Sequence, residues 1–546
     1  MTTDFSRVPG APVSADISSL VRLHTALRAV NYTYEGVASL LGDRAFEAMT
    51  RDQLTPGIYR LNQVLGYEKT ASTFSLGEKS LAQVVRFFLM GQVLESAELE
   101  AALGAGLCDL LVELGLAESA ASGSLQASVD LRPHAADDGT ELYVASDLGA
   151  HQRPGVLRKD HVLGIGHASL TLAQFTERTP LERALDLGTG CGIQTFHLLA
   201  HARHVTATDI SERALAFTRF NLLLNAPALE IDPQKLEDRV SLLHGSLLEP
   251  VAGQSFDLVV SNPPFVITPR SSGETPADQF TYRDGGMAGD GIVSTLVRQL
   301  PEVLNPGGRA QMLGNWEIPV AGPGEQADWS ARPRDWVGQE AEAWFIQREV
   351  LAPEQYAETW LRDASENRDP AHYEQAYTDY LRDFAARGVD AIGFGMIWLR
   401  RPNLQAAGER LHRFEEITYP IQQPIASFIT EAVAHYDAVT ALDDEALLAQ
   451  HLVVAGDVTE ERHLSPGSEH PSLILLRAGA GLRRTILETT ETSGFVSACD
   501  GELSVGQIVN ALATLLDWQD ASPQQELISN IRELLEKSFL RLEQGD

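Results

Sequence analysis

The tetrapeptide Asn262-Pro263-Pro264-Phe265 places an amide, two prolines and an aromatic ring directly after the apolar run 256–260. The apolar run predicts a buried strand, and two consecutive prolines cannot continue a central strand. The chain must therefore leave the sheet there and form a rigid, extended corner. The side chain of Asn262, the carbonyl of Pro263 and the ring of Phe265 could together hold a planar NH2 group. The alternative interpretation is a purely structural strand terminator.

A second candidate site lies in residues 183–192, where a short apolar strand leads into a turn with three glycines. Such a turn lets the backbone approach a ligand closely and directs the N–H groups of a following helix toward it. Residues 193–200 are predicted to be helical, and residues 204–209 predict a second strand that ends in Asp209. This spacing is typical of a mononucleotide-binding β-α-β unit, in which the acid binds the ribose hydroxyls. The glycines are Gly188, Gly190 and Gly192.

The glycine register differs from the dinucleotide fingerprint, because Ile193 follows the third glycine directly. With Asp186 two residues before the first glycine, the pattern resembles class I S-adenosylmethionine-dependent methyltransferases. The Asn-Pro-Pro-Phe corner is similar to that of their amino-methylating branch, which includes N6-adenine, N2-guanine and release-factor glutamine methyltransferases. The resemblance covers about residues 155–400 and implies an α/β, Rossmann-like core of seven strands.

The resemblance implies S-adenosylmethionine as the cofactor and assigns a role to each motif residue. Asp209 is implied to bind the ribose diol, and Ile210 to pack against the adenine. The family usually has Asp or Asn where Ser246 stands, in contact with the adenine amino group; a serine is shorter, so this contact stays open. The residues implied to hold the methionine moiety are Asp186, Gly188, Thr189, Gly190 and Gly192, and those implied to hold the acceptor nitrogen are Asn262, Pro263 and Phe265.

The implied reaction depends on alignment more than on acid–base catalysis. The nitrogen of an exocyclic amine or a carboxamide is a poor nucleophile, because its lone pair is delocalised. Hydrogen bonds from the NH2 group to Asn262 and Pro263 would favour pyramidalisation, and alignment lowers the barrier further. We therefore expect no essential histidine. Cys191, inside the glycine turn, is expected to be a packing residue rather than a nucleophile.

Composition agrees with a large cytoplasmic protein. The chain has 546 residues, which is enough for three domains. Its three cysteines show neither a disulfide framework nor metal-ligand spacing, so we expect no metal. The start of the chain lacks the basic and apolar segments of a signal peptide, and no apolar run approaches the roughly 20 residues that span a membrane.

Hydrophobic patterning predicts three domains. Residues 1–154 are expected to be a helical, winged-helix-like domain, residues 155–401 the methyltransferase core, and residues 402–546 an acidic domain that ends in a second winged-helix-like unit. A Ser-Pro-Gly-Ser segment at 465–468 is interpreted as a linker inside the last domain. An aromatic-rich helical insertion is expected near 352–388, where aromatics at helical spacing favour core packing over a substrate lid. The seven core strands are expected at about 183–187, 204–209, 239–244, 256–260, 309–314, 342–346 and 392–399.

The nature of the methyl acceptor stays open. The winged-helix-like flanks and Phe265 favour a base amine in RNA or DNA. The net charge of −33 and a segment at 282–291 that is similar to release-factor glutamine methyltransferases favour the alternative, a protein glutamine or asparagine amide. A third possibility is a non-catalytic S-adenosylmethionine-binding regulator. The basic residues Arg153, Arg158, Lys159 and His161 form either a solvated connector or phosphate contacts.

Overall fold

The computed structural model describes residues 4–70, 72–121, 123–153, 157–270, 284–322, 324, 327–363, 370–403 and 409–543. The chain divides into two compact units. The first comprises Met1–Ala173, Thr179–Gly338 and Glu349–Arg401, and the second Gln174–Arg178, Gln339–Arg348 and Pro402–Asp546. The first unit contains both the expected N-terminal domain and most of the expected core, and the division into three domains stays a prediction. Within the described ranges, no helix is long and apolar enough to cross a membrane.

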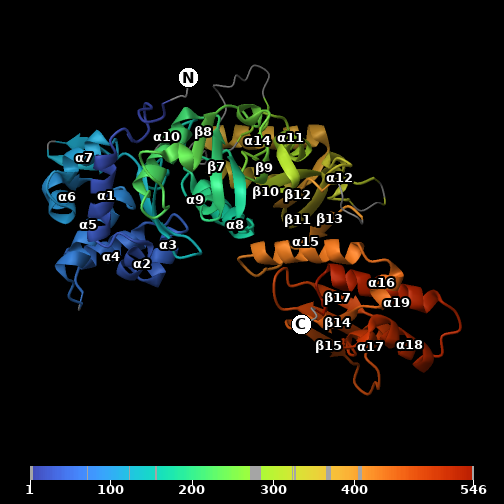
Figure 1. Ribbon diagram of the computed structural model, residues 1–546. Helices are drawn as coiled ribbons and strands as arrows, with labels where there is room; N and C mark the ends of the chain where they lie inside the picture. Colours follow the sequence, from blue (N-terminus) through green and yellow to red (C-terminus); the bar gives the residue numbers. More distant parts are fainter. Residues whose placement is uncertain are drawn as a thin grey trace. The chain divides into compact units, whose positions relative to one another are not determined.

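A large sheet forms the centre of the first unit, in which six neighbouring strands have the order β12-β10-β9-β6-β7-β8 (Figure 1). The strands β8, β7, β6, β9 and β10 are parallel, and β12 is antiparallel to β10. Their bounds are Leu181–Leu187 (β6), Ala202–Asp209 (β7), Val240–His244 (β8), Phe256–Ser261 (β9), Leu304–Pro319 (β10) and Val389–Arg400 (β12).

The parallel pair β11 (Glu342–Leu351) and β13 (His412–Glu416) completes the eight strands that this sheet has among the described residues. All seven expected strands are therefore present, and β13 is an additional one. The predicted α/β, Rossmann-like fold class is confirmed.

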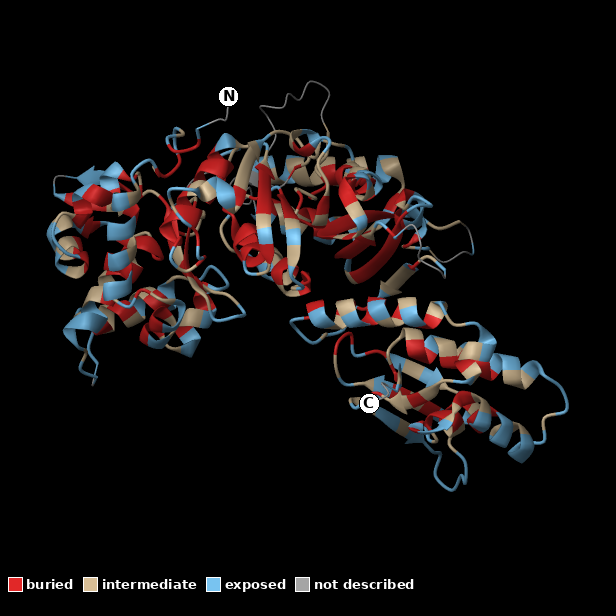
Figure 2. Cartoon of the chain, viewed as in Figure 1, coloured by how far each residue is buried: buried red, intermediate tan, exposed pale blue. Residues whose placement is uncertain are grey.

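The register of the sheet brings the two candidate motifs to the same edge. Leu187 of β6 is paired with Ser261 of β9 on one side and with Thr208 of β7 on the other. The glycine turn, the Asn-Pro-Pro corner and Asp209 therefore follow strand ends that lie side by side. The central strands are largely buried (Figure 2), as expected for a parallel sheet covered on both faces. Ligands of such sheets bind at this carboxyl edge.

Helices connect the core strands. Helix α10 begins after the N-cap Ser211, whose hydroxyl accepts from the Ala214 N–H, and it ends at Leu224. The aromatic insertion forms two helices, α13 and α14, in which Tyr356, Tyr380 and Phe384 are buried in one cluster with Ile267. The core helices are α8 (His167–Phe175), α9 (Ile193–Leu199), α10 (Glu212–Leu224), α11 (Gly291–Gln299), α12 (Ala331–Trp336), α13 (Pro353–Asp363) and α14 (Pro370–Arg387).

The N-terminal part of the first unit is mostly helical. From α5 onward the element order is helix, strand, helix, helix, strand, strand, with the sheet order β1-β3-β2. The winged-helix identity of this part stays a prediction. The elements are α1 (Ile17–Ala29), α2 (Tyr34–Leu41), α3 (Asp43–Met49), α4 (Thr55–Leu65), α5 (Leu76–Phe88), β1 (Leu94–Glu95), α6 (Ser96–Leu103), α7 (Leu107–Glu113), β2 (Ala117–Ala121), β3 (Ser124–Ala127), β4 (Asp130–Ala135) and β5 (Glu141–Ser146).

The second unit has two small sheets, β18-β14-β19 and β15-β16-β17. The Ser-Pro-Gly-Ser segment at 465–468 connects β15 to its antiparallel neighbour β16, so it is a hairpin loop and the linker interpretation was wrong. The elements are α15 (Ala426–Thr440), α16 (Asp444–Leu448), β14 (His451–Val454), β15 (Val458–His463), β16 (Leu473–Ala478), β17 (Thr485–Glu488), α17 (Thr490–Val496), β18 (Asp500–Ser504), α18 (Val505–Leu515), α19 (Ser522–Glu536) and β19 (Leu540–Leu542).

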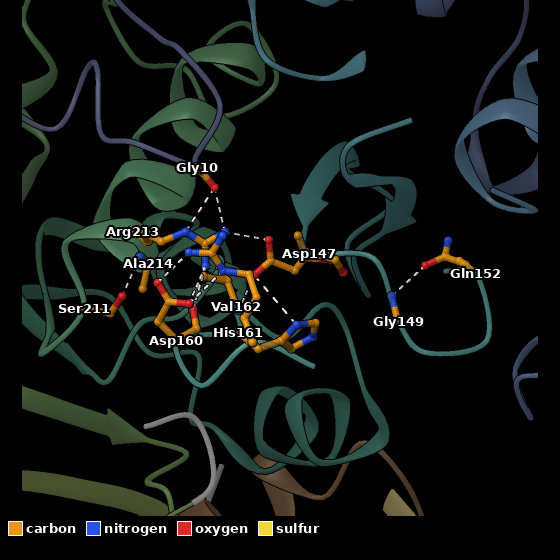
Figure 3. Close-up of polar contacts among 12 residues, drawn as sticks. Gly10, Asp147, Gly149, Gln152, Asp160, His161, Val162, Ser211, Arg213 and Ala214 are labelled. Atoms are coloured by element: carbon orange, nitrogen blue, oxygen red, sulfur yellow. Dashed lines mark hydrogen bonds and ion pairs between the residues drawn. The ribbon is translucent and has the colours of Figure 1, made fainter. Parts of the chain in front are cut away.

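Arg213 of α10 ties the N-terminal segment to the core (Figure 3). Its guanidinium group donates to the Gly10 carbonyl at 2.6 Å and to the Asp160 carbonyl at 2.6 Å, and it forms an ion pair with Asp147 at 2.7 Å. The side chains of Arg213 and Asp147 are only 7% and 12% exposed. The four residues come from distant parts of the chain, so this contact fastens the first unit together at the helix that follows Asp209.

Replacement of Arg213 should therefore destabilise the fold. Arg213→Met leaves the Asp147 carboxylate buried without its partner, and we expect the free energy of unfolding to fall by about 3–5 kcal/mol. Urea denaturation followed by circular dichroism measures this change. The matched control is Arg203→Met, because Arg203 and Glu182 form an ion pair with both side chains more than 70% exposed. Equal denaturation midpoints for the two variants would contradict the role given to Arg213.

Candidate functional site

The glycine turn after β6 has the backbone that only glycine adopts easily. Gly188, Gly190 and Gly192 have φ angles of +79°, +57° and +92°. The N–H groups of Gly188 and Thr189 both donate to the Thr208 carbonyl at 2.9 Å, which fastens the turn to the end of β7. A Cβ atom built at Gly188 or Gly190 would meet no heavy atom within 4 Å. The space beside these two glycines is therefore open to a ligand.

Asp186 lies beneath the turn and supports it. Its Oδ2 atom accepts hydrogen bonds from the hydroxyls of Thr189 and Thr195, each at 2.7 Å. Asp186 is 1% exposed, and burial raises the pKa of its carboxyl to about 6. The structure therefore shows Asp186 holding the turn in shape, and its predicted role toward the methionine moiety stays a prediction.

Helix α10 holds the turn from the other side. The Thr218 hydroxyl donates to the Gly190 carbonyl at 3.0 Å, and the Asn221 amide donates to the Cys191 carbonyl at 2.9 Å. Thr218 and Asn221 are fully buried. Sequence reasoning missed them, although polar residues at helical spacing within a largely apolar stretch are a detectable signal. Burial raises the pKa of the Cys191 thiol to about 12, which agrees with its predicted packing role.

Asp209 ends β7 beside the turn. One carboxylate oxygen accepts from the Gly190 N–H at 3.0 Å and the other from the Ser211 N–H at 2.8 Å. Each oxygen keeps capacity for a further hydrogen bond, and the residue is partly exposed. Burial is the main cause that raises the pKa of Asp209. Ile210 follows and is 55% exposed, which suits a side chain that packs against a ligand ring.

Ser246 follows the end of β8, which is the next strand along this edge. Asp209 and His244 are register partners, and the Gly245 N–H donates to the Asp209 carbonyl at 3.0 Å. The imidazole of His244 lies 2.9 Å from the Ile210 carbonyl, a contact that sequence reasoning missed. The structure thus brings Ser246 to the loop beside Asp209. Whether its hydroxyl contacts adenine stays a prediction.

Asn262, the residue that follows β9, has a buried amide oxygen to which no described residue donates. Its Oδ1 atom is buried and has no hydrogen-bond partner among the described residues, although the residue itself is partly exposed. A buried acceptor without a partner is costly, so a ligand N–H that reaches it gains a favourable bond. Pro263 is buried, and the Phe265 ring packs edge-to-face on Trp360 with a centroid distance of 6.4 Å.

Described residues that follow the corner contact one another and the corner itself. The side chains of Arg270 and Asp284 form a two-pronged ion pair, with one bond of 2.9 Å, and Phe265 forms an isolated β-bridge with Asp284. The part of the expected 282–291 motif at Tyr282 and Arg283 lies outside the described residues. Asp290 of the same motif is 2% exposed and accepts from the Glu317 N–H at 2.9 Å.

The predicted residues therefore gather at one edge of the sheet. The open glycine turn, the Asp209 carboxylate with its spare acceptor capacity and the exposed Ile210 fit a ligand with an amino acid part, a ribose and a base, as S-adenosylmethionine has. Asn262 follows β9, the neighbour of β6, and its amide oxygen has no hydrogen-bond partner among the described residues. Among the described residues no group of three or more His, Cys, Asp or Glu side chains could hold a metal ion.

Basic residues in the stretch 153–161, before the core, lie next to carboxylates. Arg153 forms an ion pair with Glu118, and Arg158 with Asp160 at 2.8 Å. His161 lies 3.7 Å from Asp147. These pairs favour the connector interpretation over phosphate contacts.

Comparison with known proteins identifies the central region. Residues 148–277 match the methyltransferase small domain, and residues 29–128 match a domain of unknown function, DUF7059. A ribosomal protein uL3 glutamine methyltransferase of Bradyrhizobium diazoefficiens is 31% identical over 159 residues, which are 28% of this chain and 46% of that protein. A release factor glutamine methyltransferase of Koribacter versatilis is 39% identical over 154 residues, 26% of this chain and 49% of that protein.

Another release factor glutamine methyltransferase, from Geobacter sulfurreducens, is 35% identical over 131 residues, 23% of this chain and 42% of that protein. The chain spans less than half the length of each of these curated relatives. A solved methyltransferase from Pyrococcus furiosus has 15% identity and a TM-score of 0.25, and the match covers 46% of this chain and 92% of that structure. The match of residues 148–277 to the methyltransferase small domain agrees with the class I methyltransferases that the sequence motifs resemble.

Proposed function

We propose that this protein uses S-adenosylmethionine to methylate the side-chain amide nitrogen of a glutamine in a protein substrate. The turn at 188–192 and Asp209 hold the cofactor, and Asn262, Pro263 and Phe265 hold the amide. The proposal is carried by the buried Oδ1 atom of Asn262, which has no partner within the described part of the chain and lies at the edge of the sheet where the open glycine turn lies. That oxygen is a ready acceptor for one hydrogen of a planar NH2 group.

The chemistry assigns a distinct task to each residue. When bound, S-adenosylmethionine supplies an electrophilic methyl group on its sulfonium. Asn262 and the Pro263 carbonyl accept the two N–H hydrogens, which fixes the amide plane and directs the nitrogen lone pair out of conjugation. The Phe265 ring covers one face of the amide. The excess proton is acidic once the nitrogen carries the methyl group, so solvent can take it.

Two observations support a protein amide over the nucleic acid base that the sequence favoured. The relatives that match the core are named as glutamine methyltransferases of a ribosomal protein and of release factors. Helix α7 of the N-terminal winged-helix-like part and helix α19 of the C-terminal one also lack exposed basic residues. The exposed residues of α7 are Asp109, Val112 and Glu113, and those of α19 from Gln525 onward are Gln525, Glu526, Ser529 and Glu533. Acidic helices of this kind repel a phosphate backbone.

The acceptor class can be tested directly. The purified enzyme and tritiated S-adenosylmethionine are incubated with an extract of cells that lack the gene, and the labelled fraction is treated with protease or ribonuclease. We expect label that protease releases and ribonuclease does not, and peptide mass spectrometry should place one added methyl group on a glutamine. Label released by ribonuclease would restore the nucleic acid acceptor. Binding of the cofactor with no labelled product would indicate a regulator.

Loss of the Asp209 carboxylate should weaken cofactor binding. Asp209→Ala removes two charge-assisted hydrogen bonds to the ribose, and we expect a loss of about 2–4 kcal/mol in the binding free energy. Isothermal titration with S-adenosylmethionine measures it. Glu182→Ala, which removes an exposed carboxylate from β6, is the matched control and should bind as the wild type does. Unchanged affinity in Asp209→Ala, or tight binding of NADH to the wild type, would refute this assignment.

Loss of the Asn262 amide should separate binding from turnover. Asn262→Ala should keep the cofactor affinity and lower turnover by roughly 100-fold or more, since the lost bond acts in the transition state. Asn262→Asp should keep part of the activity, because a carboxylate also accepts from NH2. The control is Asn305→Ala, since Asn305 donates to Asp257 near the opposite end of β9. If Asn262→Ala keeps full turnover, the corner is only a structural strand terminator and the proposed role of Asn262 is wrong.

A further inference from the structure

The segment after the acceptor corner is bonded to a helix that lies far along the chain. The N–H of Ile267 donates to the hydroxyl of Tyr356 at 2.8 Å, across 89 residues. Tyr356 belongs to α13, the first helix of the aromatic insertion. Ile267 is 1% exposed and Tyr356 is fully buried. This bond therefore forms in a site without competition from water, where an unmet N–H is costly.

The same hydroxyl also accepts a hydrogen bond from β10. The Asn315 side chain donates to it at 2.8 Å, and Asn315 is fully buried. Met312 of β10 is the register partner of Ser261, the residue before the corner. Asn315 therefore lies three residues further along β10, beside the point where the corner leaves the sheet. One oxygen atom thus joins the corner segment, the sheet and the insertion.

Aromatic rings hold the Tyr356 side chain in place. Its ring lies 5.6–6.4 Å from the rings of four neighbours in the same unit. One of these neighbours, Trp360, is one helical turn along α13 and packs edge-to-face on Phe265 at 6.4 Å. Helix α13 thus contacts both the ring of the corner and the backbone that follows it. The four neighbours are Trp360, Tyr380, Phe384 and Phe394.

Burial raises the pKa of Tyr356 well above its usual range, so the hydroxyl is neutral at physiological pH. It accepts two N–H bonds as a neutral phenol. A phenylalanine would keep the ring in the cluster and remove only this acceptor, which leaves two buried donors without a partner.

We propose that Tyr356 is a positioning residue for the acceptor corner. Its hydroxyl fixes the backbone at Ile267, and through it the angle at which Asn262 and Pro263 present their oxygens to the acceptor amide. The aromatic insertion therefore acts on the acceptor side of the site, although its rings are core residues. The effect on turnover rests on the proposed function, whereas the effect on the backbone does not.

Tyr356→Phe in the full-length protein tests this role with two readouts. Hydrogen exchange of the peptide 262–270, measured by mass spectrometry, should become at least 10-fold faster at the Ile267 amide. The affinity for S-adenosylmethionine should stay within about twofold, while kcat for the labelled protein acceptor should fall about 10-fold or more. Tyr377→Phe is the matched control, because the Tyr377 hydroxyl contacts Glu358 at 3.2 Å on the same insertion; both readouts should stay at the wild-type level.

A second variant separates positioning from a general loss of packing. Phe384→Leu loosens the same cluster but keeps the Tyr356 hydroxyl, so it should lower the melting temperature without selective exchange at Ile267. Unchanged exchange at Ile267 in Tyr356→Phe, or equal acceleration in Phe384→Leu, would overturn the positioning role. If the wild type transfers no methyl group to protein while exchange in Tyr356→Phe accelerates as expected, the proposed function fails and the positioning role stands.

Discussion

Helix α10 carries buried polar side chains that must all find partners, and the site depends on how they do so. Buried polar groups are costly unless they are hydrogen-bonded, so each one fixes the position of another segment. Arg213 binds the N-terminal segment, and Thr218 binds the glycine turn. Asn221 and Asn225 exchange hydrogen bonds with the backbone of Ala145 and Tyr143 in β5, at 2.7–2.9 Å.

These bonds explain why the N-terminal part and the core form one compact unit. The amides of Asn221 and of the C-cap residue Asn225 satisfy N–H and C=O groups of β5, which pairs with β4 alone among the described strands, in the way that another strand would. Asn221 also donates to the Cys191 carbonyl, so the same side chain connects the β4–β5 hairpin to the glycine turn. The glycines of the turn have no side chains that could stabilise its conformation. The hydrogen bonds of Asp186 and of Thr218 and Asn221 in α10 stabilise it instead.

The parts of the site that could be predicted are those encoded in short segments. The strands, the glycine turn, the Ser211 cap and the corner each have a local pattern, and the order of strands followed from their resemblance to a known core. The residues that contact these motifs were not predictable. The hydrophobic pattern of a helix or strand indicates which face is buried, but not which other segment packs against that face. Asn221 lies 30 residues after Cys191, and Tyr356 lies 89 residues after Ile267. The hairpin loop at 465–468 was misjudged because Pro and Gly mark turns and linkers alike.

The two halves of the site are supported by different parts of the chain. The glycine turn takes its shape from β6, β7 and α10, which are bonded to the N-terminal part. The Asn-Pro-Pro-Phe corner takes its shape from β10 and α13, through Tyr356 and the contact of Trp360 with Phe265. The insertion lies between β11 and β12 and shares none of the α10 contacts described above. Substitutions in α13 are therefore expected to disturb the corner at 262–267 while the glycine turn keeps its geometry, because the contacts of α13 with the corner do not involve α10.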